Sequence, residues 1–169
     1  MIQGDEHMPL QETSQETDLG VVVDHTLKPT AHCKRASRNA MYALKQLRTT
    51  FGAISKDNFN ALYKAFIRPH IEYCSQAVGP YMVKNLQVLE RIQRRATKMV
   101  RGLKNVPYQE RLIMLQLTSV KQRLLRGDLI EVYKILTGRS KLKADLFFER
   151  STSTRTRGHH LKVEKRRAV

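Results

Sequence analysis

Two stripes of opposite character follow one predicted helix in the middle of the chain, over residues 86–103. At about 100° per residue, its apolar residues fall on one face and its basic residues on the other. The apolar face consists of Leu89, Ile92, Ala96, Met99 and Leu103, and the basic face of Arg91, Arg94, Arg95, Lys98 and Arg101. Because Glu90 is the only acid in the segment, ion pairs along the helix cannot neutralise the basic face. We expect this helix to pack by one side and attract an anion with the other.

The same periodicity predicts two helices before this segment. The first begins near Pro29 and carries a stripe of small and apolar residues, namely Cys33, Ala36, Ala40, Leu44, Leu47 and Phe51. Lys34, Arg38 and Lys45 share another of its faces. The second starts at Ser55 or Asp57 as a cap, and Pro69 kinks or restarts it because proline has no N–H to donate.

Two more helices are predicted after the central one. A short helix opens at Val106-Pro107, and a long one follows Thr118 or Ser119 and ends at Gly138. The long helix has an apolar stripe of spacing 4, 3, 4, formed by Leu125, Leu129, Val132 and Leu136. This stripe predicts a position near the centre of a bundle.

The first 28 residues differ from the rest and predict a small β appendage. Gly4-Asp5 has turn chemistry, residues 8–10 are typical of a short edge strand, and the run from Leu19 to Val23 is rich in β-branched residues. The polar stretch 11–18 follows neither period and predicts a loop. The expected fold is mainly α: an irregular bundle of about five helices, with a small N-terminal β-hairpin or edge and a disordered basic C-terminal tail. The expected domains are 1–28, 29–138 and 139–169.

The excess of basic residues seen in the central helix holds for the whole chain. Thirty-one Lys and Arg against 15 Asp and Glu give a formal net charge of +16 and a pI near 10.3. A field of this sign concentrates polyanions, so RNA, DNA or an RNA·DNA hybrid is the expected partner. The candidate contacts are the five basic residues of the central helix together with Lys104, Lys121, Arg123 and Arg126. Phosphate contacts of this kind carry little sequence information, and base-specific readout is not expected.

Other function classes find little support in the sequence. No apolar run approaches the ~20 residues that span a bilayer, so we expect an intracellular protein, in nucleus or cytoplasm, that binds no membrane. Cys33 and Cys74 are too few and too far apart for a disulfide framework, and both sit in helical patterns as small buried residues would. His70 and Cys74, four residues apart, offer only two of the four ligands that zinc needs. We therefore expect no metal, no cofactor, no small-molecule substrate and no cysteine nucleophile.

The aromatic residues are divided by their spacing. Tyr63, Phe66 and Tyr73 share a helical pattern with apolar neighbours, which favours membership of the core over stacking on bases. Tyr108 follows Pro107 in a loop setting that predicts an exposed ring.

Four strings, in order and at matching spacing, resemble the carboxy-terminal part of the reverse transcriptase of non-LTR (LINE-type) retrotransposons. They are DLGV at 18–21, LYKAFIRPHIEYC at 62–74, LERIQRRATK at 89–98 and LRGDLIEVYKIL at 125–136. The similarity runs from about residue 18 to His159. It implies a position just after the palm of this RNA-directed DNA polymerase: a β-edge followed by the helical thumb that grips the template-primer duplex.

The chain departs from that family in the residues needed for catalysis. A polymerase palm holds two Mg²⁺ ions with clustered aspartates, whereas this chain has no Asp-Asp pair. We therefore expect a non-catalytic fragment, truncated upstream, whose Mg²⁺ would belong to the missing palm and which has that palm as a possible partner. The alternatives are a helical bundle for protein interaction, with apolar faces left bare by the missing palm, or an inactive transposon relic.

Overall fold

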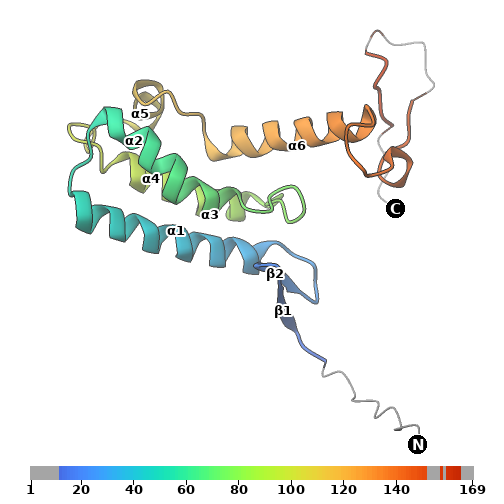
Figure 1. Cartoon of the computed structure of the whole chain (residues 1–169), viewed down its shortest axis with the longest axis horizontal. Coiled ribbons are helices and arrows are strands. Elements are labelled where there is room, and N and C mark those ends of the chain that lie inside the picture. Colours follow the sequence, from blue (N-terminus) through green and yellow to red (C-terminus); the bar gives the residue numbers. More distant parts are fainter. Residues whose placement is uncertain (1–11, 152–156, 158, 165–169) are drawn as a thin grey trace, which may run out of the picture. The chain divides into compact units, whose positions relative to one another are not determined.

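The computed structural model describes residues 12–151, 157 and 159–164. It divides the chain into two compact units, Met1–Lys121 and Gln122–Val169. The elements (Figure 1) are β1 (Gln15–Asp18), β2 (Val21–Asp24), α1 (Thr30–Phe51), α2 (Lys56–Leu62), η1 (Tyr63–Ile67), α3 (Arg68–Glu72), α4 (Val83–Thr97), α5 (Tyr108–Met114), α6 (Val120–Leu136) and η2 (Ala144–Leu146). Because α2, η1 and α3 follow one another without a break, the described residues form five continuous helices and the short 3₁₀ helix η2. The predicted fold class, mainly helical with a small N-terminal hairpin, is confirmed.

The hairpin differs from the prediction in its first strand. β1 pairs antiparallel with β2, Asp18 opposite Val21, across a two-residue turn in which Leu19 and Gly20 both have positive φ, 45° and 79°. Such turns match the right-handed twist of the paired strands. The prediction of a loop over 11–18 is therefore wrong for Gln15–Asp18, because a fully exposed polar strand has no apolar alternation to reveal it. The turn at Gly4 and the edge strand at 8–10 lie outside the described residues.

One buried histidine joins the hairpin to the helices. The backbone N–H of Val22 donates to Nδ1 of His32 at 3.4 Å, and Nε2 of the same ring donates to the carbonyl of Tyr73 at 3.4 Å. His32 lies in the first turn of α1 and is 6% exposed. The imidazole thus links β2, α1 and the segment that follows α3.

The core of the first unit forms where α1 packs against α4, η1 and α3. The predicted stripe of α1 is buried from Cys33 to Leu47, whereas Phe51 remains 53% exposed. At Pro69, predicted to kink or restart the second helix, the chain stays helical, but the preceding turn η1 is π-helical, with the N–H of Arg68 reaching back to Tyr63. Tyr63 is buried, but Phe66 and Tyr73 are 52% and 53% exposed, so their expected place in the core is wrong.

The central helix is shorter than the sequence predicts. α4 ends at Thr97, and the chain then turns to form a short parallel bridge between Val100 and Ile54. The residues predicted to complete its apolar stripe reach the core from this turn: Leu103 is 2% exposed and Met99 half-buried. Because the turn keeps its apolar residues inward, helical periodicity continues past the end of the helix.

The second unit contains most of α6 and the segment after it. Arg150 Nη2 donates to the carbonyl of Leu136 at 2.8 Å, and Arg150 forms an antiparallel bridge with Val163. The predicted buried stripe is wrong for Leu125 and Leu129, which are 55% and 61% exposed. An apolar stripe shows which side of a helix can pack but not whether another element covers it. The boundary between the two compact units, between 121 and 122, falls inside α6, and the expected division at 138/139 stays a prediction.

Candidate nucleic-acid interface

The basic residues of α4 lie on its exposed side. Arg91, Arg94, Arg95 and Lys98 are exposed, while Leu89, Ile92 and Ala96 on the opposite side are at most 2% exposed. Among the residues that the structure describes, none of these four cations forms an ion pair. Their charge is thus left available to an external anion.

The single acid of α4, Glu90, is directed elsewhere. Its Oε2 accepts from the backbone N–H of Val120 at 2.9 Å and of Lys121 at 3.4 Å, at the N-terminus of α6. The hydroxyl of Tyr108 donates to the same carboxylate. Burial, together with Glu90, raises the pKa of the Tyr108 phenol, which therefore stays protonated and acts as the donor. Glu90 stabilises the start of α6, where the helix dipole favours negative charge, and does not neutralise the basic side of α4.

A buried arginine holds the other end of α4. Arg111, on α5, is 3% exposed. Its guanidinium donates to Thr97 Oγ1 at 3.0 Å, to the carbonyl of Val106 at 2.9 Å and to the carbonyl of Arg94 at 3.4 Å. A cation at the C-terminus of a helix also interacts favourably with the helix dipole. Arg111 therefore fixes the last turn of α4, which carries Arg94 and Arg95.

The helices α1 and α4 run parallel, as three contacts along their length establish. Asn85 Nδ2 lies 3.3 Å from Thr30 Oγ1, Arg95 Nη1 lies 3.7 Å from Met41 Sδ, and Ile54 N donates to the carbonyl of Met99 at 3.1 Å. Residue numbers rise together on both sides of the contact. The side of α1 near Met41 therefore adjoins the side of α4 near Arg95.

Cations gather on both sides of this seam. At ~100° per residue, Lys34, Arg38, Lys45 and Arg48 all lie within about 60° of Met41 around α1, and Lys84, Arg91 and Lys98 lie within about 60° of Arg95 around α4. All eight are exposed, and α1 contains no acid. None forms an ion pair within the described part of the chain. We call Lys34, Arg38, Lys45, Arg48, Lys84, Arg91, Arg95 and Lys98 the α1–α4 cationic surface.

The other residues predicted from the sequence lie outside this surface. Arg94 turns to the opposite flank of α4, where its guanidinium carbon stacks 4.4 Å from the centre of the Tyr108 ring. Arg101 and Lys104 are exposed in the turns after α4, and Lys121 is exposed in the first turn of α6. Arg123, half-buried, and Arg126, exposed, belong to the second unit.

Sequence reasoning missed two parts of this arrangement. Lys84 was missed because the predicted helix began at residue 86. Lys34, Arg38 and Lys45 were noted only as a shared face of the first helix, and Arg48 was not noted. Their adjacency to α4 depends on how the two helices pack, which no local pattern contains. Tyr108 was predicted to be exposed but is half-buried, because it begins α5 and bonds to Glu90 and to Gln93 at 2.9 Å.

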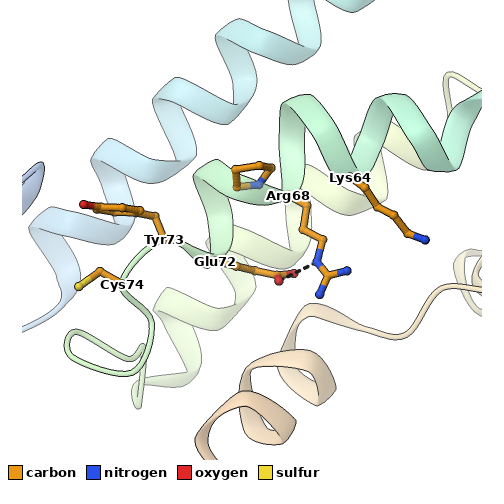
Figure 2. Close-up of a pocket in the computed structure, with 6 residues that line it drawn as sticks. Lys64, Arg68, Glu72, Tyr73 and Cys74 are labelled. Atoms are coloured by element: carbon orange, nitrogen blue, oxygen red, sulfur yellow. Dashed lines mark hydrogen bonds and ion pairs between the residues drawn. The ribbon is translucent and has the colours of Figure 1, made fainter. Parts of the chain in front are cut away.

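A separate hollow lies beside α3, and Figure 2 shows the side chains that line it. Within it, Arg68 Nε and Glu72 Oε2 are 2.7 Å apart, so this cation is already paired. Cys74 lies beyond the end of α3, half-buried, with a positive φ of 54°, and His70 is exposed. The expectation that Cys74 is a buried helical residue is therefore wrong, and it does not share a helical face with His70.

The two cysteines are expected to differ in reactivity. Cys33 is 2% exposed, and burial raises the pKa of its thiol to about 11. At pH 8 only about 0.1% of such a thiol is the reactive thiolate, and that fraction rises about ten-fold per pH unit up to the pKa. In the Cys74→Ser variant, Ellman's reagent should therefore react slowly until the protein is unfolded. A fast reaction of native Cys74→Ser at pH 8 would contradict this assignment.

Neither a protein-family model, a curated protein nor a solved structure matches this chain. Among the described residues, no group of three or more His, Cys, Asp or Glu side chains is placed to hold a metal ion. None of the described helices has the length and apolar character needed to cross a membrane.

Proposed function

We propose that this chain is a non-catalytic nucleic-acid-binding module that holds the phosphate backbone of a duplex. The observation that carries the proposal is the α1–α4 cationic surface, in which eight exposed cations on two parallel helices have no ion-pair partner in the described residues. Arginine and lysine bind phosphate well, and arginine can do so through two parallel hydrogen bonds. RNA, DNA or an RNA·DNA hybrid is the partner we propose.

The resemblance to the post-palm region of a non-LTR reverse transcriptase makes the proposal more specific. A thumb must hold any product sequence while the duplex slides past, and contacts to phosphate rather than to base edges suit that task. On this proposal the chain holds the template-primer duplex, and the catalytic aspartates with their Mg²⁺ belong to a palm that is not part of this sequence. An intracellular location, in nucleus or cytoplasm, belongs to the same proposal.

A salt titration of the full chain tests the proposed function. Binding to a fluorescent RNA·DNA hybrid, followed by anisotropy between 50 and 200 mM salt, should weaken by several decades if about six to eight phosphates are neutralised. A shallow dependence on salt, or no binding at 50 mM, would overturn the proposal. Binding of hybrids of different sequence should be about equal, because phosphate contacts do not read bases.

A second candidate is supported by the exposed apolar side of α6. Leu125, Leu129, Ile130 and Tyr133 are between 45% and 61% exposed along one helix. Runs of exposed apolar side chains often mark protein contacts, which favours a protein-interaction bundle that associates with a second copy through this side. Sedimentation of the full chain at micromolar concentration tests self-association through this side, and a clean monomer would argue against it.

A further inference from the structure

A second hollow in the first unit, of about 430 Å³, lies where α1 ends and α2 begins. This volume falls in the range of about 300 to 1,000 Å³ that is typical of small-ligand sites. It is lined by Phe51, Ala53, Ile54, Ser55, Asn58, Ala61, Leu62 and Arg101. We call it the Phe51 pocket.

Backbone hydrogen bonds bring the two sides of this pocket together. Ile54 N donates to the carbonyl of Met99 at 3.1 Å, and Arg101 N donates to the carbonyl of Ile54 at 2.9 Å. On the α2 side, Ser55 Oγ accepts from Asn58 N and so caps the helix. Arg101 is thereby held beside the turn that follows Phe51, although 50 residues separate the two in sequence.

The pocket combines an aromatic ring with polar groups that have no internal partner. Phe51 is 53% exposed at the last position of α1, and the predicted apolar stripe therefore ends in an uncovered ring. Within the described residues, neither the Arg101 guanidinium nor the Asn58 side-chain amide makes a hydrogen bond or ion pair. An exposed ring can stack on the face of a base, an amide can hydrogen-bond to its edge, and a cation can pair with the phosphate of the same nucleotide.

The pocket lies at one end of the α1–α4 cationic surface. Arg48 is in the last turn of α1, three residues before Phe51, and Lys98 follows the last residue of α4, three residues before Arg101. Because α1 and α4 are parallel, both cationic stripes end here. A strand whose phosphates follow the surface would reach the pocket with its next nucleotide.

We propose that the Phe51 pocket takes one unpaired nucleotide of the bound nucleic acid, with the base on the Phe51 ring and its phosphate beside Arg101. A base inside a duplex has both faces covered by its neighbours and can stack on a protein ring only after it leaves the duplex, so the pocket favours a single-stranded extension. This inference rests on the proposed backbone binding and adds to it a preference for a duplex that carries a tail.

The test compares a blunt RNA·DNA hybrid with the same hybrid carrying a four-nucleotide DNA tail, in which one base is 2-aminopurine. The chain has no tryptophan, so the fluorescence of this base is read without interference. Wild-type protein should bind the tailed hybrid about ten-fold more tightly, the order of gain expected from one stacked base, and should quench the 2-aminopurine.

Three variants assign the effect to the pocket. Phe51→Ala should lose both the tail preference and the quenching while its affinity for the blunt hybrid stays unchanged, and Phe51→Tyr should restore both because a ring is kept. Phe66→Ala is the matched control, because Phe66 is a phenylalanine of nearly equal exposure, 52%, that does not line the pocket. It should behave as wild type.

The outcomes separate this inference from the proposed function. Equal binding of blunt and tailed hybrids by wild type, or an unchanged preference in Phe51→Ala, would overturn the pocket assignment and leave backbone binding intact. Loss of the preference in Phe66→Ala would also overturn it. Absence of salt-dependent binding to either hybrid would overturn both.

Discussion

Replacement of Arg111 by alanine is expected to destabilise the first unit by about 2–4 kcal/mol, because buried oxygens lose a donor and the removed side chain leaves a cavity. Alanine removes the hydrogen bonds from the guanidinium to Thr97 Oγ1 and to the carbonyls of Val106 and Arg94. Each oxygen that stays buried without a donor costs about 1–3 kcal/mol. Urea unfolding followed by far-UV circular dichroism measures the loss.

The geometry around Arg111 explains why the effect should be large. Burial lowers the pKa of this guanidinium, and the charge of Arg94 lowers it further, yet arginine stays protonated in proteins. In the described residues no carboxylate pairs with it, so neutral oxygens and the face of the Tyr108 ring, 5.5 Å away, must hold its charge. Few side chains can place five donors in one plane in this way.

Two further variants distinguish the network from the charge alone. Arg111→Met keeps much of the volume but supplies no donor to Thr97 Oγ1 or to the carbonyl of Val106, and should lose nearly as much stability as the alanine variant. Arg91→Ala, the control, removes an exposed arginine from α4 and should change stability by less than about 0.5 kcal/mol. A similar small effect in Arg111→Ala would contradict the role assigned to Arg111.

Replacement of Arg91 and Arg95 together by glutamine is expected to weaken binding to a duplex and to flatten its salt dependence. Each phosphate contact contributes about 0.9 to the slope of log affinity against log salt on a B-form duplex, so the slope should fall by about 1.8. At 50 mM salt, affinity should fall about 10- to 100-fold. Glutamine keeps the helix propensity of arginine nearly unchanged, and anisotropy with the hybrid measures both quantities.

The matched control removes two cations that lie off the α1–α4 cationic surface. Lys64 is on η1, outside the two helices that carry this surface, and Lys141 is in the second unit; both are exposed. The Lys64→Gln, Lys141→Gln variant has the same net charge as the arginine pair variant and should keep the wild-type slope. Equal losses in both variants would mean that net charge, rather than this surface, drives binding.

The periodicity of apolar residues was enough to predict most of the helices and their buried sides. The stripe from Cys33 to Leu47 and the positions Leu89, Ile92 and Ala96 are buried as predicted, because a helix must bury its apolar side whatever partner it meets. A disturbance at Pro69 was also predictable, since a residue without an N–H interrupts helical hydrogen bonding wherever it stands; the structure shows it as the π-helical turn η1.

The ends of helices and the exposed strand were harder to predict from the sequence. Helical spacing continued to Leu103 although α4 ends at Thr97, because a turn that keeps its apolar residues inward looks like a helix to a pattern of period 3.6. β1 is exposed along its whole length, so nothing but its partner β2 marks it as a strand.

By itself, the sequence determined that basic residues occupy one side of a helix that has a single acid, and that α1 contains none. Only the tertiary structure decided what those charges face. It directs Glu90 to the start of α6 and buries Arg111 behind α4. It also sets α1 parallel to α4, so that two separate stripes become one surface that ends beside Phe51. The physical reason is that spacing along a chain fixes directions around one helix axis, whereas the neighbour on each side is chosen by packing between segments far apart in sequence.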